Sequence, residues 1–293
     1  MSNPLLQPHP LPPFSSIDAE HVLSAVEEHL NTNRTRISEL LGQFASGEAT
    51  PTWETLIEPM DEWHDELSKA WSPVGHLNGV LNSDDLREAY NACLPLLSQY
   101  WTEFGQNEDL FKAYDALKNS PEFDKLSSPQ KTAINNALRD FRLSGIDLPA
   151  DKKVRYAEIQ QKLSALTSKF SENVLDATAA WTKHITDVSE LDGVPESGLG
   201  LLAQQAQQRD LDGYVITLDF PSYMPIMSYC TNRELREELY TAFVTRASDV
   251  GPNAGEFDNS QNMKDILALR YELATLLGFD NYAEYSVATK MAE

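Results

Sequence analysis

The side chains best able to do chemistry in this sequence are histidines and carboxylates, and the histidine spacing does not form a metal site. The six histidines are His9, His21, His29, His64, His76 and His184. A helical zinc site of the H-E-x-x-H type needs two imidazoles one turn apart, and no two of these histidines are three, four or five residues apart. The spacing therefore excludes a helical zinc site of this type among the histidines.

The densest group of ligand-type side chains is expected to be a solvated helix face. Five of them fall close together: Asp61, Glu62, His64, Asp65 and Glu66. On a helix these positions spread around the axis and cannot all converge on one ion. Such residues are mostly exposed, so we expect them beside Trp63 on the surface. His184 lies in a predicted strand and is interpreted as a single core or edge histidine.

Other catalytic signatures are missing from the sequence. It contains no G-x-S-x-G elbow, glycine-rich phosphate loop, dinucleotide fingerprint or paired C-x-x-C. Carboxylates are plentiful, but no pair has a context that suggests burial, so acid and base roles cannot be assigned. Cys93 and Cys230 lie far apart and are expected to be buried thiols in a reducing compartment. The residues alone indicate an acidic scaffold without a catalytic centre.

The longest predicted element is one amphipathic helix. It opens at Pro149 and Asp151, and no glycine or proline interrupts it until well past Ala179. Apolar residues recur along it at steps of three and four, at Tyr156, Ile159, Leu163, Leu166, Phe170 and Ala177. This stripe must be covered by other helices. Asn173 interrupts the stripe and is expected to be a hydrogen-bonded asparagine that fixes helix register.

Helical periodicity dominates the rest of the chain, with one β exception. In the first half of the chain, helices are predicted near residues 17–45 with Ser16 as cap, from Thr50 with a kink at Pro59, at 82–106 with a kink or break at Pro95, and after Ser128. In the second half, helices are predicted at 195–208, from a capping box at Thr231–Glu234, and after Asn259 as cap. Two segments, 181–186 and 214–218, read as strands. The fold class is therefore mainly α: a multi-helix, bundle-like lobe with one long central helix and a minor two-strand β element.

The length of the chain limits its domain organisation, and its net charge limits the classes of partner that it can bind. Residues 1–14 form an extended, proline-rich lead-in that wraps the surface or is disordered, and 15–293 form the lobe, with a possible subdivision near residue 148. The 45 acidic residues outnumber 23 basic ones, giving a net charge of -22. This charge repels phosphate backbones and anionic lipids, so nucleic acid and membrane are not expected partners. No secretion signal is recognised at the start, and a cytoplasmic location is expected.

Several long irregular segments resemble the thimet oligopeptidase and neurolysin family of zinc metallopeptidases. They are LRDFRLSGIDLP (138–149), VLDATAAWTKHITD (174–187), LDGYVITLDFPSYMPIMSYC (211–230), REELYTAFVTRASDVGPNAGEFDN (236–259) and LLGFDNYAEYSVATKMA (276–292). Members of that family are longer, mostly helical proteins in which two lobes face a channel that admits short peptides. Their zinc is held by an H-E-x-x-H helix and a downstream glutamate. That motif does not occur in this sequence.

The resemblance implies a specific role for this chain. It would be the N-terminal, channel-forming lobe of a cytoplasmic zinc oligopeptidase, with a C-terminal catalytic lobe and short peptides as its partners. Zinc would belong to the full-length enzyme, and the fragment alone would bind none and be inactive. An isolated lobe would also expose apolar surface, so self-association is expected.

The polar loop at residues 246–259 supplies the candidate channel-facing or lobe-contacting residues. Arg246 could meet a peptide carboxylate, and Asn253 or Asn259 could bond a peptide backbone. The alternative is that Arg246 pairs with a local acid and the asparagines only shape turns. For the whole chain, the alternative function is a helical peptide- or protein-binding module that acts alone without catalysis.

Overall fold

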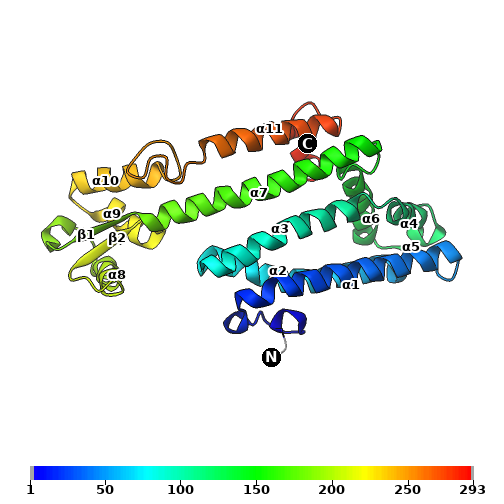
Figure 1. Cartoon of the computed structure of the whole chain (residues 1–293), viewed down its shortest axis with the longest axis horizontal. Coiled ribbons are helices and arrows are strands. Elements are labelled where there is room, and N and C mark those ends of the chain that lie inside the picture. Colours follow the sequence, from blue (N-terminus) through cyan, green and yellow to red (C-terminus); the bar gives the residue numbers. More distant parts are fainter. Residues whose placement is uncertain (1–2, 292–293) are drawn as a thin grey trace. The chain divides into compact units, whose positions relative to one another are not determined.

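A computed structural model describes residues 3–291 of the chain and confirms a mainly α-helical fold (Figure 1). The chain divides into two compact units. The first comprises residues up to Ala165 together with those from Ala268 onward, and the second comprises Leu166–Leu267. Two helices, α7 (Ala150–Ala180) and α11 (Ser260–Leu276), contribute residues to both units.

The first unit is built from helices that follow one another with short links. They are α1 (Ala19–Ser46), α2 (Glu58–Val80), α3 (Asp84–Gly105), α4 (Glu108–Lys118), α5 (Pro121–Lys125), α6 (Ser128–Leu143), the start of α7, the end of α11 and α12 (Tyr282–Val287). Helix α1 packs against both α2 and α3, and α4 packs against α6. Leu30, Leu97 and Tyr100 lie in one buried cluster of this unit, and Ile134 and Leu138 lie in another.

The N-terminal lead-in packs on the helices through Leu5, whereas its residues 7–12 are exposed. Short 3-10 turns form at η1 (Pro4–Leu6) and η2 (Phe14–Ser16). Leu5 is buried in the same cluster as α1 and α3, and its carbonyl accepts a hydrogen bond from His29 Nε2 at 3.1 Å. Residues 1–2 of the predicted lead-in lie outside the described part of the chain.

Several helix boundaries differ from the sequence predictions because short-range chemistry decides them. The residue before α1 is Asp18, not Ser16, and its backbone N–H donates to His21 Nδ1 at 3.1 Å. A π-helical turn, η3 (Trp53–Ile57), precedes α2, so Pro59 falls in the first turn of α2 where a missing N–H costs little. Pro95 lies inside one continuous helix, α3.

The first half of α7 packs against the end of α11 within the first unit. Tyr156, Ile159 and Leu273 form the buried centre of this contact. Arg155 clamps the same pair of helices, because its Nε and Nη2 donate to the two carboxylate oxygens of Glu272 at 2.6 and 2.8 Å. The predicted long helix and its buried stripe are therefore confirmed where α7 begins.

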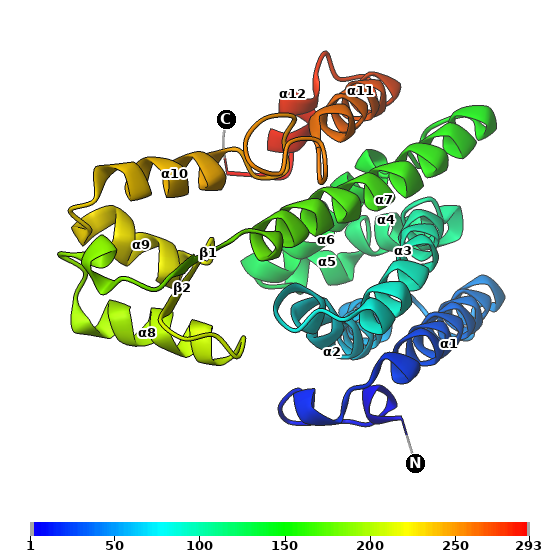
Figure 2. The same cartoon turned by 60° about the vertical axis from the view of Figure 1, so that its left-hand side comes forward.

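The second unit surrounds the small sheet predicted from the sequence. Strands β1 (Thr182–Ile185) and β2 (Tyr214–Thr217) pair antiparallel, with Thr182 opposite Thr217 and Ile185 opposite Tyr214. The other elements are η4 (Val188–Leu191), α8 (Glu196–Gln207), α9 (Phe220–Tyr229) and α10 (Arg233–Val244). Helix α9 contacts both α8 and α10 (Figure 2). Ile216, Leu202 and Leu239 belong to the shared buried core.

The start of α10 corrects another predicted cap. Asn232, not Thr231, caps the helix, because its Oδ1 accepts from the Leu235 backbone N–H at 3.2 Å. Thr231 instead donates its hydroxyl to the Asp192 carbonyl at 3.2 Å, which ties α10 to the loop after η4. His184 is exposed at the edge of the sheet, as the sequence suggested, and its Nε2 lies 2.6 Å from the Asp212 carbonyl oxygen.

Candidate functional site

Arg246 follows α10 in the second unit and reaches back to α7. Its Nη1 donates to the Thr178 hydroxyl at 2.8 Å, and its Nε donates to the Phe243 carbonyl at 3.0 Å. The guanidinium carbon lies 3.8 Å from the centroid of the Phe243 ring, which itself stacks on Tyr223 at 4.1 Å. The side chain is half-buried. The Arg246 cation is thus held in one direction by the Thr178 hydroxyl, the Phe243 carbonyl and the face of the Phe243 ring.

The electrostatic surroundings of Arg246 keep it charged and leave it without a bonded acid. Burial lowers the pKa of Arg246, while nearby Asp219 and Tyr223 act in the opposite direction. Arginine remains protonated in proteins because its unperturbed pKa lies above about 12. Within residues 3–291 no ion pair joins Arg246 to a carboxylate. A group that carries its own carboxylate could therefore pair with it.

Asn259 is almost completely buried, with 1% of its surface exposed. Its Oδ1 accepts from the side-chain amides of Asn173 at 2.9 Å and Asn262 at 3.1 Å. Its Nδ2 donates to the Phe170 carbonyl at 3.1 Å. The side-chain amide is therefore occupied by contacts that join the start of α11 to α7. The register role expected for Asn173 is supported by this contact.

Asn259 stands directly before α11, as predicted for its cap, and its carbonyl accepts the Met263 backbone N–H at 2.8 Å, while its side chain bonds to α7 and Asn262. Helix α11 begins at Ser260, and the carboxylate of Asp258 accepts the Ser260 backbone N–H at 2.8 Å. Asn262 adds a further link to α7, since its Nδ2 donates to the Leu166 carbonyl at 3.0 Å. The contacts of Asn259 and Asn262 span 86 to 96 residues of sequence. Helical spacing carries no signal for such contacts.

Asn253 lies at the outer part of the loop and differs from Asn259 in exposure. It is half-buried, and its Nδ2 donates to the Glu256 carboxylate at 3.2 Å. Its carbonyl accepts the backbone N–H of the same Glu256 at 3.1 Å. These are local turn contacts. Of the two asparagines, only Asn253 keeps part of its side chain accessible to a ligand.

The loop that carries these residues has an unusually constrained backbone. Ala247 adopts a φ of 51° and Gly251 a φ of 91°, both in the left-handed region that disfavours side chains. A Cβ at Gly251 would overlap the Thr245 side chain. The Asn259 backbone N–H donates to the Ala247 carbonyl at 3.0 Å, which closes the loop at its base. The backbone that follows Arg246 is therefore held in one closed loop conformation.

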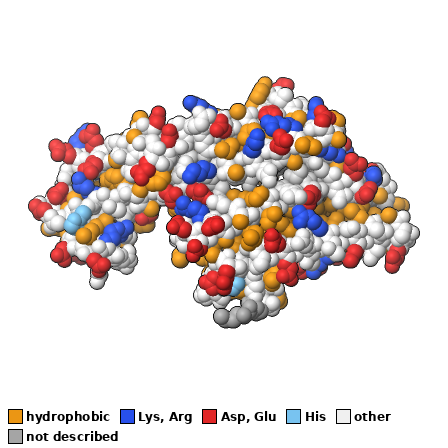
Figure 3. Space-filling model, viewed as in Figure 1, with side chains coloured by type: hydrophobic (Ala, Val, Ile, Leu, Met, Phe, Trp, Pro, Cys, Tyr) orange, Lys and Arg blue, Asp and Glu red, His pale blue; other side chains and the backbone are white. Residues whose placement is uncertain are grey.

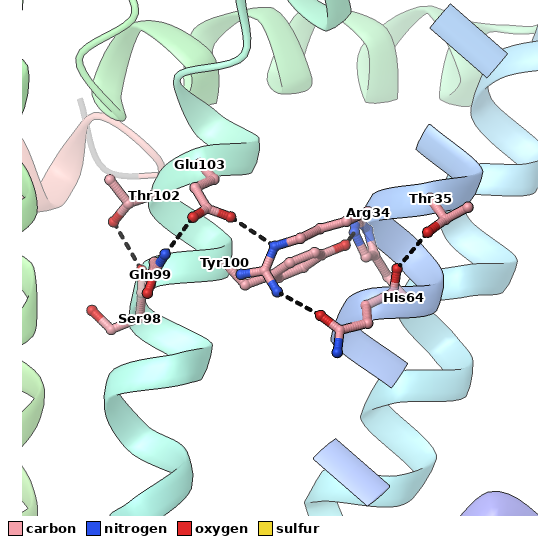
Figure 4. A network of polar contacts seen from close by, with 9 residues as sticks. Arg34, Thr35, His64, Ser98, Gln99, Tyr100, Thr102 and Glu103 are labelled. Atoms are coloured by element: carbon pink, nitrogen blue, oxygen red, sulfur yellow. Dashed lines mark hydrogen bonds and ion pairs between the residues drawn. The ribbon is translucent and has the colours of Figure 1, made fainter. Parts of the chain in front are cut away.

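A second polar group lies in the first unit, where α1, α2 and α3 meet (Figure 4). Arg34 reaches from α1 to α3, with its Nε 2.8 Å from Glu103 Oε2 and its guanidinium carbon 5.6 Å from the centroid of the Tyr100 ring. His64 Nε2 lies 3.0 Å from the Tyr100 hydroxyl. The imidazole also contacts Trp101 and Phe104, with ring centroids 4.8 Å away in each case.

The environment of His64 corrects the prediction of a solvated position. Asp61, Glu62, Asp65 and Glu66 are exposed, but His64 is half-buried because it lies on the side of α2 that faces α3. Burial lowers the pKa of His64 to about 4. The imidazole is therefore neutral at pH 7, and its Nε2 contacts the Tyr100 hydroxyl.

The described residues offer neither a metal-binding donor set nor a reactive thiol. Within residues 3–291, no three His, Cys, Asp or Glu side chains are grouped so that they could hold a metal ion. Cys93 and Cys230 are free and buried, as predicted. Burial, together with the Glu27 carboxylate, raises the pKa of the Cys93 thiol to about 12, so it stays protonated.

Comparison with known proteins identifies two matching regions. Residues 21–153 match the family described as "Neurolysin/Thimet oligopeptidase, N-terminal domain", and residues 226–293 match "Peptidase family M3". The chain is 55% identical over 293 residues to "Oligopeptidase A" of Escherichia coli strain K12 and 40% identical over 298 residues to "Probable cytosolic oligopeptidase A" of Arabidopsis thaliana. It is 24% identical over 249 residues to "Saccharolysin" of Saccharomyces cerevisiae.

The matched relatives are much longer than this chain. The alignment to the E. coli protein covers 100% of this chain but 42% of the relative, and the Arabidopsis alignment covers 99% and 41%. With Saccharolysin the shares are 83% and 33%. None of the helices in residues 3–291 combines the length and apolar character required to cross a membrane.

Proposed function

This chain belongs to peptidase family M3, and from that premise we propose that it is the helical, substrate-channel-forming lobe of a longer zinc metallopeptidase that hydrolyses short peptides. The observation that carries the proposal is the 55% identity to an oligopeptidase over the whole of this chain but only 42% of that relative. The proposal places the H-E-x-x-H region and its zinc in the part of the relatives that the chain does not match. A cytoplasmic location is part of the same proposal.

The proposed contribution of this chain is to bind peptide, with Arg246 as a contact for a peptide carboxylate. Two features support that role: the guanidinium is fixed by Thr178 and Phe243, and no ion pair within residues 3–291 neutralises it. We assign Asn253 to the same surface because its side chain is partly accessible. Asn259 is buried, so its proposed role is to hold the loop against α7 rather than to touch peptide.

A comparison of three proteins tests the proposed function. The first is this 293-residue chain, and the second is the part of E. coli oligopeptidase A that the chain does not match. The third is a chimera that joins the two. We expect the chimera to bind zinc at one per chain and to cleave short peptides. The 293-residue chain should do neither, and the E. coli part alone should cleave poorly because it lacks half of the peptide site.

Two outcomes would contradict the proposal. Stoichiometric zinc or peptide cleavage by the 293-residue chain alone would show that the chemistry lies within it. Equal cleavage by the E. coli part alone and by the chimera would show that this chain adds nothing to substrate binding. Zinc is measured by atomic emission after dialysis, and cleavage by chromatography of the peptide products.

A further inference from the structure

A large cavity lies in the first unit, between α1, α3 and α4, and none of the sequence predictions included it. Its volume is about 760 Å³. Pockets of a few hundred to about 1,000 Å³ are the usual size for a ligand of drug or short-peptide dimensions. Its apolar lining residues are Ile37, Leu41, Phe44, Ala45, Pro51, Phe104, Ala113 and Ala116. The wall therefore favours a ligand that buries apolar side chains.

The charged residues around the cavity neutralise one another. Arg34 pairs with Glu103 at 2.8 Å, and Lys112 pairs with Asp109 at 3.0 Å. All four residues line the cavity. This balance contrasts with the net charge of -22 for the chain. An anionic lipid or a strongly basic peptide would have to break one of these pairs, whereas an uncharged ligand would leave both intact.

Two uncommitted polar groups in the lining suit a peptide backbone. Asn107 caps α4 through its Oδ1, which accepts from the Leu110 N–H at 2.9 Å. Among the described residues, the Asn107 amide NH₂ and the Ser38 hydroxyl make no hydrogen bond. An amide donor and a hydroxyl can pair with the C=O and N–H groups of a peptide that enters the cavity.

We propose that this cavity binds a short, uncharged peptide segment whose large apolar side chains lie against α1, α3 and α4. The apolar wall, the balanced charges and the free amide and hydroxyl together define that ligand class. The choice of peptide over another neutral apolar molecule rests on the proposed function.

Gly42 provides a direct test because it lines the cavity from an exposed position in α1. A Cβ at Gly42 would meet no heavy atom within 4 Å, so a larger side chain can occupy the open space without displacing the helix. Gly79 in α2 is a matched control in the same unit: it is also helical and exposed, and a Cβ there would meet nothing within 4 Å. Gly79 does not line the cavity.

The experiment measures calorimetric binding of an acetylated and amidated pentapeptide with a central Leu-Phe-Leu sequence. We expect saturable one-to-one binding to the unaltered chain, at least tenfold weaker binding to Gly42→Phe, and binding to Gly79→Phe within twofold. A peptide with three serines at the centre should bind at least tenfold more weakly. Thermal melts of both variants check that each is folded.

Equal affinity for the unaltered chain and Gly42→Phe, or no saturable binding to the unaltered chain, would overturn the inference. Preference for the serine peptide would do the same, because it would remove the role of the apolar wall. The results that would overturn this cavity site can be distinguished from those that would overturn the proposed peptidase function. A chimera that cleaves peptides equally well with and without Gly42→Phe would leave the peptidase proposal standing and remove only the cavity site.

Discussion

At the scale of single residues, substitutions of Arg246 and Thr178 can distinguish recognition of a peptide charge from support of the loop structure. Both contribute to one hydrogen bond, from Arg246 Nη1 to the Thr178 hydroxyl at 2.8 Å. Only Arg246 brings a positive charge. A substitution at Thr178 therefore removes the structural contact and keeps the cation, which makes the pair a test of the proposed carboxylate contact.

Replacing Arg246 should weaken binding of peptides that end in a free carboxylate. In the chimera, Arg246→Gln should raise KM for such a peptide by about 10- to 100-fold, since a hydrogen bond to a charged group contributes about 1.5–3 kcal/mol. The same peptide with an amidated end should change by less than about twofold, because no charge is lost from that complex. Steady-state kinetics with the two peptides measures the difference.

Thr178→Val is the control for this prediction. It should affect the free and amidated peptides by the same small factor, because it loosens the loop without changing its charge. If Arg246→Gln acts equally on both peptides, the residue has a structural role and does not contact the carboxylate.

His64 should make the stability of the first unit depend on pH. Its folded-state pKa is lowered by burial to about 4, whereas an unfolded histidine titrates near about 6.5. The unfolded chain then binds more protons between these values, so the free energy of unfolding falls as the pH drops through that window. The slope is at most about 1.4 kcal/mol per pH unit, and half-burial reduces it.

The variant His64→Gln should remove this part of the pH dependence. Between pH 7 and pH 5, the unaltered chain should lose about 1–2 kcal/mol more stability than the variant, as measured by urea unfolding. Tyr100→Phe should keep the dependence, because it removes a hydrogen bond but leaves the imidazole buried. Parallel pH profiles for the unaltered chain and His64→Gln would show that His64 does not titrate in this way.

At the scale of elements, the junction between α7 and α11 depends on buried amides. Asn259 links Asn173, Asn262 and the Phe170 carbonyl. Asn259→Ala would remove the acceptor of the buried Asn173 amide and one partner each from Asn262 and the Phe170 carbonyl, and an unsatisfied buried group costs roughly 1–3 kcal/mol. We expect a total loss of about 2–4 kcal/mol in the free energy of unfolding, with faster hydrogen exchange in residues 166–178.

Asn253→Ala is the matched substitution in the same loop. Asn253 is half-buried and bonds only locally to Glu256, so its removal should change stability by no more than about 0.5 kcal/mol. Equal losses for the two variants, or unchanged exchange in residues 166–178 of Asn259→Ala, would mean that the amide network does not hold the junction.

The elements that could be predicted from sequence are those whose signal is local. The α7 stripe and the β1–β2 pair follow from spacing and residue type, and both are present. The side-chain contacts of Asn259 could not be predicted because its partners at residues 170 and 173 lie far away in sequence. His64 was misread for the same reason, since the ring that receives it is on α3. Periodicity predicts which face of a helix is buried, but not which distant side chain meets it.

The same limit applies to the sites. The spacing of charged residues in α1, α3 and α4 looks like ordinary surface, and the cavity exists only once those helices pack. The composition of the loop at 246–259 did mark it as a place to search. Its constrained backbone, with Ala247 at a φ of 51°, could not be predicted because alanine usually avoids that conformation.

At the scale of the whole molecule, charge and exposed apolar surface act against each other. Acidic side chains are spread over the face shown in Figure 3, with basic side chains between them, and the net charge is -22. Repulsion between copies of the chain is screened at high salt, because the Debye length falls to about 3 Å at 1 M. Apolar contacts are not weakened by salt in this way. Association should therefore increase with ionic strength.

Exposed apolar residues on α10 give this association a testable origin. Tyr240 and Val244 are each 53% exposed and lie one helical turn apart. We expect the weight-average mass in sedimentation equilibrium to rise with protein concentration in 0.5 M NaCl and to rise less in 0.02 M NaCl. The double variant Tyr240→Ser, Val244→Ser should reduce the rise, because it removes apolar surface without changing the charge.

Val80 and Leu81 at the end of α2 provide the control, since they are 65% and 71% exposed and also adjacent. Val80→Ser with Leu81→Ser should leave association unchanged if the α10 surface is responsible. Equal effects of the two double variants would mean that association is non-specific. A strict monomer at high protein concentration and high salt would show that the exposed residues of α10 do not drive self-association of this chain.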